Sequence, residues 1–210
     1  MDELKTYTFG NQYFTHCARA IQGLDIWSLK SKIFDGKALP PPYEPPIYDG
    51  PEPSMEVENG KLYYGSCHCG AVRLVVRLKP LETWDTLSDG EERIVECNCS
   101  VCVRGAQVWC YPHKDQSVVL GRENISYRIF NVKTERKAFC KRCGVPLFNE
   151  TNPLSDGEVA ALSDREKKWR QGVLNNRNIN LRILHNFDYK VLKTKYLDGA
   201  RDIPGDYVDP

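Results

Sequence analysis

The stretch GSCHCGAVRL, residues 65–74, joins two closely spaced cysteines to an apolar run with β character. One residue separates Cys67 from Cys69, and a glycine stands on each side of the pair, at Gly65 and Gly70. A short C-x-C turn lets two thiolates reach one metal ion from a single loop, and glycine supplies the positive φ that such turns often need. The stretch therefore predicts a metal-binding loop that leads into a β-strand.

Two further cysteine motifs follow, ECNCSVC at residues 96–102 and FCKRCGVPLF at residues 139–148, where Gly144 takes the place of Gly70. The three motifs hold seven of the nine cysteines, which are Cys67, Cys69, Cys97, Cys99, Cys102, Cys140 and Cys143. Two loops with two cysteines each can close a four-sulfur zinc site, and three sulfurs within six residues can hold a second zinc with one coordination position open. Spacing alone leaves open which pairs combine, and one four-cysteine zinc with three idle thiols is the main alternative.

Composition argues for metal rather than disulfides, and for an intracellular protein. The first residues, MDELKTYTFG, lack the basic and apolar regions of a signal peptide, and intracellular thiols are normally reduced. No stretch of the chain reaches the roughly 18 consecutive apolar residues of a membrane helix. Lysine plus arginine number 29 against 28 for aspartate plus glutamate, a net charge of +1. We therefore expect a cytoplasmic protein, with the nucleus as the alternative intracellular location, and neither a nucleic-acid partner nor a membrane partner.

We predict three regions along the chain: an incomplete N-terminal repeat at 1–39, a proline-rich linker at 40–57 and a main domain at 58–210. Seven of the 13 prolines lie between Pro40 and Pro53, which is typical of a semi-rigid spacer. Residues 18–36 align without gaps with residues 181–199, at seven identities in nineteen positions. We interpret the N-terminal region as a shortened copy of the end of the main domain.

The main domain has the pattern of a mainly β fold, because short apolar runs alternate with turn residues. We predict strands at 61–64, 71–78, 93–97, 107–111, 117–120, 125–130, 145–148 and 179–184. One helix is predicted at 164–171, where Ser163 and Glu166 have the spacing of a capping box.

The three cysteine motifs, in this order, resemble the signatures of the glutathione-dependent formaldehyde-activating enzyme and centromere protein V family, and the resemblance extends over roughly residues 62–209. It implies a zinc-containing, mainly antiparallel β fold with two Zn²⁺ ions per chain. By this resemblance a structural zinc is held by Cys67, Cys69, Cys140 and Cys143. A second, reactive zinc is held by Cys97, Cys99 and Cys102, which would act as ligands rather than as nucleophiles.

The same resemblance implies a carbon–sulfur lyase activity on a small-molecule thiol and an aldehyde, with formation of S-hydroxymethylglutathione as the named reaction of the family. The alternative is a non-catalytic zinc-binding interaction module like centromere protein V. Arg104 is a candidate neighbour for a substrate carboxylate. We expect His68 and His113 to lie at the surface and Cys110 to be a small buried hydrophobic residue.

Overall fold

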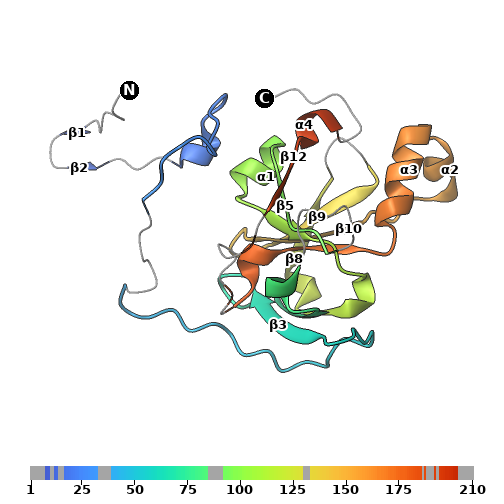
Figure 1. Cartoon of the computed structure of the whole chain (residues 1–210), viewed down its shortest axis with the longest axis horizontal. Helices are drawn as coiled ribbons and strands as arrows, with labels where there is room; N and C mark the ends of the chain where they lie inside the picture. Colours follow the sequence, from blue (N-terminus) through green and yellow to red (C-terminus); the bar gives the residue numbers. More distant parts are fainter. Residues whose placement is uncertain are drawn as a thin grey trace.

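The computed structural model describes residues 8–9, 12–13, 17–32, 39–84, 92–129, 133–185, 187, 192 and 194–202. Within these residues the chain is mainly β, as predicted, with sheets of seven, three and two strands (Figure 1). The strands are β1 (Thr8–Phe9), β2 (Gln12–Tyr13), β3 (Lys61–Ser66), β4 (Arg73–Leu78), β5 (Val95–Cys97), β6 (Val108–Cys110), β7 (Ser117–Leu120), β8 (Ile125–Arg128), β9 (Glu135–Cys140), β10 (Pro146–Thr151), β11 (Arg177–Asn180) and β12 (Lys195–Leu197).

The small main-domain sheet has the order β3-β4-β7, with both pairs antiparallel. Its central strand β4 is buried along nearly its whole length, because β3 and β7 pair with its edges and the rest of the domain covers it. The edge strand β7 alternates between buried and half-buried residues, as a strand with one covered face does. Tyr63 of β3 and Leu74 of β4 lie in one hydrophobic core with Phe148 of β10 and Ile179 of β11, so the two sheets share a core.

The seven-stranded sheet has the order β12-β5-β6-β11-β10-β9-β8. All neighbouring pairs are antiparallel except β12 and β5, which are parallel. The sequence patterns missed β9 and β12, whose charged and polar residues hide the apolar alternation. The strand predicted at 179–184 is too long, because β11 ends at Asn180. The Asn180 side chain accepts a hydrogen bond from the Arg182 backbone N–H and starts the 3-10 turn η6 (Leu181–Ile183).

The described residues contain four α-helices, three more than predicted: α1 (Ser100–Arg104), α2 (Asp156–Ala160), α3 (Asp164–Val173) and α4 (Gly199–Asp202). The predicted helix is confirmed as α3, with the capping box between Ser163 and Glu166. Trp169 joins α3 to β9 by donating its indole N–H to Glu135 Oε2 at 3.0 Å. The other helices have four or five residues, too few for a helical period to show in the sequence. The remaining 3-10 turns are η1 (Ala18–Ala20), η3 (Leu81–Thr83), η4 (Lys114–Gln116) and η5 (Arg122–Asn124).

The proline-rich segment passes beside the small sheet, near the label β3 in Figure 1, and contacts two arginines of β4. Arg73 forms an ion pair with Asp49 at 2.8 Å and donates to the Ile47 carbonyl at 2.9 Å. Arg77 forms ion pairs with Glu52, at 2.6 Å, and with Glu56. The segment is thus attached to β4 by ion pairs and by a hydrogen bond to its own backbone, while the boundaries of the three predicted regions stay a prediction.

Candidate metal centres

Four cysteines from two hairpins meet where the two sheets adjoin. Cys67 and Cys69 lie in the turn between β3 and β4, and Cys140 and Cys143 lie at the end of β9 and in the turn to β10. The four sulfur atoms lie within 4.8 Å of one another. The structure thus joins the first and third cysteine motifs, a pairing that their spacing left open.

Each of these turns is closed by backbone hydrogen bonds that aim two sulfurs the same way. Gly70 N–H donates to the Cys67 carbonyl at 3.1 Å, and Gly144 N–H donates to the Cys140 carbonyl at 2.9 Å. Both glycines have the expected positive φ, +72° and +73°. Backbone N–H groups also point at the sulfurs, from Val72 to Cys67 at 3.3 Å and from Arg142 to Cys140 at 3.4 Å.

Gly65 has a different role from the one its position suggested. It lies inside β3 and is not among the glycines with positive φ. A Cβ atom at this position would lie 2.8 Å from the Ile183 carbonyl oxygen, which belongs to η6. Gly65 therefore allows a close approach of two backbone segments and does not shape the cysteine turn.

The four-sulfur group fits a zinc ion. A tetrahedral site with Zn–S distances of about 2.3 Å has sulfur atoms about 3.8 Å apart. The Cys67 and Cys69 sulfurs lie 3.6 Å apart, and the Cys69 and Cys140 sulfurs lie 3.7 Å apart. Cys67 and Cys140 are fully buried and Cys69 is exposed, so the group lies at the edge of the core.

Burial makes it unfavourable for these four thiols to ionise together unless a cation is present. Burial raises the pKa of Cys67 to about 12. Burial also opposes ionisation of Cys143, but hydrogen bonds from the Val145 and Cys69 backbone and from the neighbouring thiols outweigh it and lower its pKa to about 6. A divalent cation supplies the positive charge that lets all four sulfurs ionise together.

The second group consists of Cys97, Cys99 and Cys102, whose sulfurs also lie within 4.8 Å of one another. Cys97 ends β5, Cys99 is the N-cap residue of α1, and Cys102 lies one turn into that helix. The short helix α1, which the sequence patterns did not predict, folds the third sulfur back toward the first two. The three sulfurs of this group form a donor set that zinc accepts, with one coordination position left for another ligand.

Trp109 of β6 contacts this group directly. Its indole N–H donates to the Cys102 sulfur at 3.4 Å, and the ring is 3% exposed. The Lys137 ammonium lies 5.3 Å from the centre of the same ring and forms a cation–π contact with it. Hydrogen bonds with Cys102 and Cys97 hold the pKa of the Cys99 thiol well below its usual range.

A cavity of about 460 Å³ opens beside the three-cysteine group. Cys97, Cys102, Trp109, Tyr111 and Leu197 are among the residues that line it. Its other lining residues include five cationic side chains and two acidic ones: Arg93, Lys137, Arg165, Lys168, Lys195, Glu135 and Asp202. The cysteine group is therefore accessible from a cavity with an excess of positive charge.

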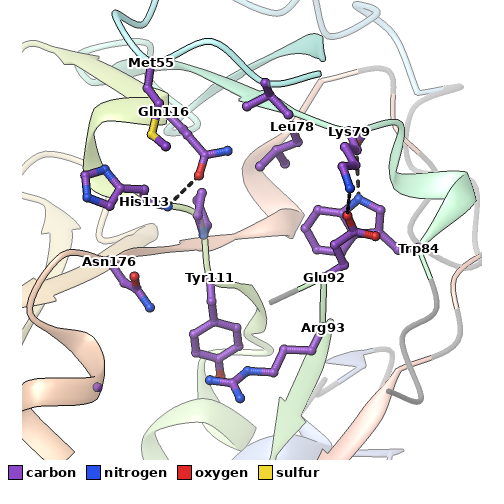
Figure 2. Close-up of a pocket in the computed structure, with 13 residues that line it drawn as sticks. Met55, Leu78, Lys79, Trp84, Glu92, Arg93, Tyr111, His113, Gln116 and Asn176 are labelled. Atoms are coloured by element: carbon purple, nitrogen blue, oxygen red, sulfur yellow. Dashed lines mark hydrogen bonds and ion pairs between the residues drawn. The ribbon is translucent and has the colours of Figure 1, made fainter. Parts of the chain in front are cut away.

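A larger cavity of about 680 Å³ adjoins the first, because Arg93, Tyr111 and Gly172 line both. Figure 2 shows this cavity, with Tyr111 and Arg93 together at one end, His113 and Met55 at another, and the Lys79–Glu92 ion pair beside Trp84. No cysteine lines it. Its size favours it as a site, but Cys97 and Cys102 of the three-cysteine group line the smaller cavity instead.

The remaining residues chosen from the sequence lie apart from the sulfurs. His68 is exposed, as expected, and stacks on Tyr43 with ring centres 5.8 Å apart. His113 is half-buried and lines the larger cavity. Cys110 is fully buried, as expected. Arg104 lines two other cavities beside α1, but not the one that Cys97 and Cys102 line.

Arg93, Tyr111 and Trp109 are among the lining residues that the sequence patterns did not single out. Each belongs to or adjoins a predicted strand, and their residue types carry no metal or catalytic motif. Their relevance follows from the packing of β5 and β6 against α1, which brings them to one cavity.

Comparison with known proteins does not assign the chain to a family. Among the residues that the structure describes, every helix is too short or too polar to span a lipid bilayer. No family model matches the chain. The chain is similar to the crystal structure of a Rhodobacter sphaeroides protein, a structural genomics target, with 20% sequence identity and a TM-score of 0.44. That similarity covers 64% of this chain and 99% of the other, and at these values it carries no argument about function.

Proposed function

We propose that the chain is a zinc-dependent enzyme of the carbon–sulfur lyase type that acts on a small-molecule thiol and an aldehyde. Formation of S-hydroxymethylglutathione from glutathione and formaldehyde is the reaction that we expect. The three-cysteine group is the reactive centre, and the four-cysteine group is structural. The observation that best supports the proposal is a three-sulfur donor set that borders a cavity, since catalytic zinc sites keep three protein ligands and one open position.

The proposed reaction is an addition without a redox step. A bond forms between the thiol sulfur and the aldehyde carbon, the carbon–oxygen π bond breaks, and the thiol proton goes to the aldehyde oxygen. A bound zinc lowers the pKa of a thiol in its open position, so that the thiolate predominates near neutral pH.

The residues of the chain hold and orient the reacting groups. Cys97, Cys99 and Cys102 act as metal ligands. Trp109 holds Cys102 in place through its indole N–H, and Leu197 adds an apolar wall to the cavity. The cationic side chains around the cavity attract an anionic thiol such as glutathione.

The Cys99→Ser variant tests this function. The wild-type protein should contain two zinc ions per chain, bind glutathione and add it to ¹³C-formaldehyde, as followed by NMR. Cys99→Ser should keep its far-ultraviolet circular dichroism, contain about one zinc ion fewer, and lose glutathione binding and activity.

Cys17→Ser is the matched control, because Cys17 is exposed and belongs to neither cysteine group. It should behave as the wild type. A wild-type protein that holds one zinc and binds no thiol would instead support the non-catalytic interaction module. Activity that survives in Cys99→Ser would exclude the three-cysteine group as the reactive centre.

A further inference from the structure

Arg93 stands at the junction of the two cavities. It precedes β5 by two residues, and it lines both the cavity beside Cys97 and Cys102 and the larger one next to it. Its guanidinium carbon lies 4.5 Å from the centre of the Tyr111 ring, and Figure 2 shows the two side chains lying together. A ligand that extends from the sulfurs into the larger cavity at this junction would lie next to this pair.

The guanidinium N–H groups of Arg93 have no hydrogen-bond acceptor in the part of the chain that the structure describes. No hydrogen bond or ion pair is formed by its guanidinium there, and the Tyr111 ring is its contact. Other part-buried arginines differ: Arg77 pairs with Glu52 and Glu56, and Arg136 pairs with Glu150. A half-buried guanidinium without a carboxylate partner keeps its planar set of N–H donors for a ligand.

Tyr111 links Arg93 to the sulfurs. Its ring packs against the cluster formed by Cys97, Cys102 and Trp109. The guanidinium is thus held by a ring that also contacts the cysteine group, and its position relative to the sulfurs is set by packing.

We propose that Arg93 is a specificity-determining residue that binds a carboxylate of the substrate thiol while the substrate sulfur lies at the three-cysteine group. The inference rests on the proposed function and deepens it, since it makes the substrate a carboxylate-bearing thiol. An arginine guanidinium binds a carboxylate through two parallel N–H···O bonds. The stacking of Arg93 on Tyr111 keeps its pair of N–H donors oriented for such binding. Arg104, the arginine chosen from the sequence, lines two other cavities and not the one beside Cys97 and Cys102.

The experiment compares two probes that differ only at the carboxylates, glutathione and glutathione diethyl ester. Binding of each is measured by calorimetry to the zinc-loaded wild-type protein and to Arg93→Gln, Arg93→Lys and Arg104→Gln. Arg93→Gln should weaken glutathione binding about 10–100-fold, the usual effect of losing a charged hydrogen bond, and should change ester binding by less than about twofold on the same basis. Arg93→Lys should keep part of the preference for glutathione over its ester, because lysine keeps the positive charge but lacks the paired N–H donors of the guanidinium.

Arg104→Gln is the matched control, since it removes the same charge beside α1 and should leave both affinities unchanged. The inference is overturned if Arg93→Gln and the wild type prefer glutathione over its ester to the same degree. A wild-type protein that binds neither probe overturns the proposed function itself, and the role of Arg93 with it. Zinc content and circular dichroism establish that the variants are folded and loaded.

Discussion

At the scale of single residues, Trp109 connects the packing of the sheet to a metal ligand. Its indole N–H donates to the Cys102 sulfur, and partners of this kind hold a ligand in its binding orientation. Trp109→Phe keeps an aromatic ring in the core but removes the donor. We expect the affinity for the second zinc to fall about 10–100-fold.

A competition titration with a chelator measures this affinity. Trp84→Phe is the control, because the Trp84 indole donates to the Lys79 carbonyl and not to a sulfur. Equal zinc affinities in Trp109→Phe and the wild type would show that the N–H···S contact does not support metal binding.

At the scale of strands, Glu150 of β10 connects the two neighbouring strands of the large sheet, β9 and β11. It lies opposite Arg136 of β9 and Arg177 of β11, and its carboxylate is 2.6 Å from Arg136 and 3.7 Å from Arg177. Burial opposes its ionisation, but hydrogen bonds from Tyr127 and Arg136 and the charge of Arg122 outweigh burial and lower its pKa from the ordinary 4.5.

Because the folded pKa is lowered, the Glu150 carboxylate stabilises the fold above about pH 4.5, and this contribution disappears as the pH falls through the lowered value. Glu150→Gln should therefore cost about 1–3 kcal/mol of unfolding free energy at pH 7, and the difference should shrink toward zero in acid. Urea unfolding at several pH values measures it. Glu44→Gln is the control, because it removes the same charge from an exposed residue and should have little effect on stability at any pH. A loss of unfolding free energy in Glu150→Gln that does not change with pH would rule out this charge network.

At the scale of the whole molecule, the four-cysteine group brings turns from the two sheets together, and a zinc ion bound there would cross-link the sheets. One pair of sulfurs comes from the β3–β4 turn of the small sheet and the other from the β9–β10 turn of the large one. A structural zinc contributes about 10–16 kcal/mol of apparent binding energy that is also folding energy, whereas an ordinary domain has only about 5–15 kcal/mol of stability. Cys143→Ser should therefore unfold the domain, as judged by circular dichroism and zinc content.

Cys99→Ser is the comparison for that variant, because its group closes only a short loop between β5 and α1. It should stay folded with about one zinc ion fewer. The opposite result, a folded Cys143→Ser with an unfolded Cys99→Ser, would exchange the roles that we assign to the two groups.

Local patterns sufficed for the features that depend on neighbours in the chain. The alternation of apolar residues predicted most strands, and the Ser163–Glu166 spacing predicted α3, because these depend on nearby residues. The C-x-C and C-x-x-C spacings likewise predicted that the two sulfurs of each pair lie close together, and the sulfurs of each group do lie within 4.8 Å of one another. Short elements such as α1 escaped prediction, since five residues carry too little pattern.

Contacts between distant segments depend on packing, and no local pattern encodes them. The spacing left open whether Cys67 and Cys69 combine with Cys140 and Cys143, while the family resemblance implied that they do; in the structure the two hairpin turns meet. The fold likewise decides which arginine lines the cavity beside the cysteines. Arg104 is the closer to the cysteines in the chain, but α1 turns it toward other cavities, whereas the pairing of β5 with β6 brings Arg93 and Tyr111 to the cavity that the sulfurs share.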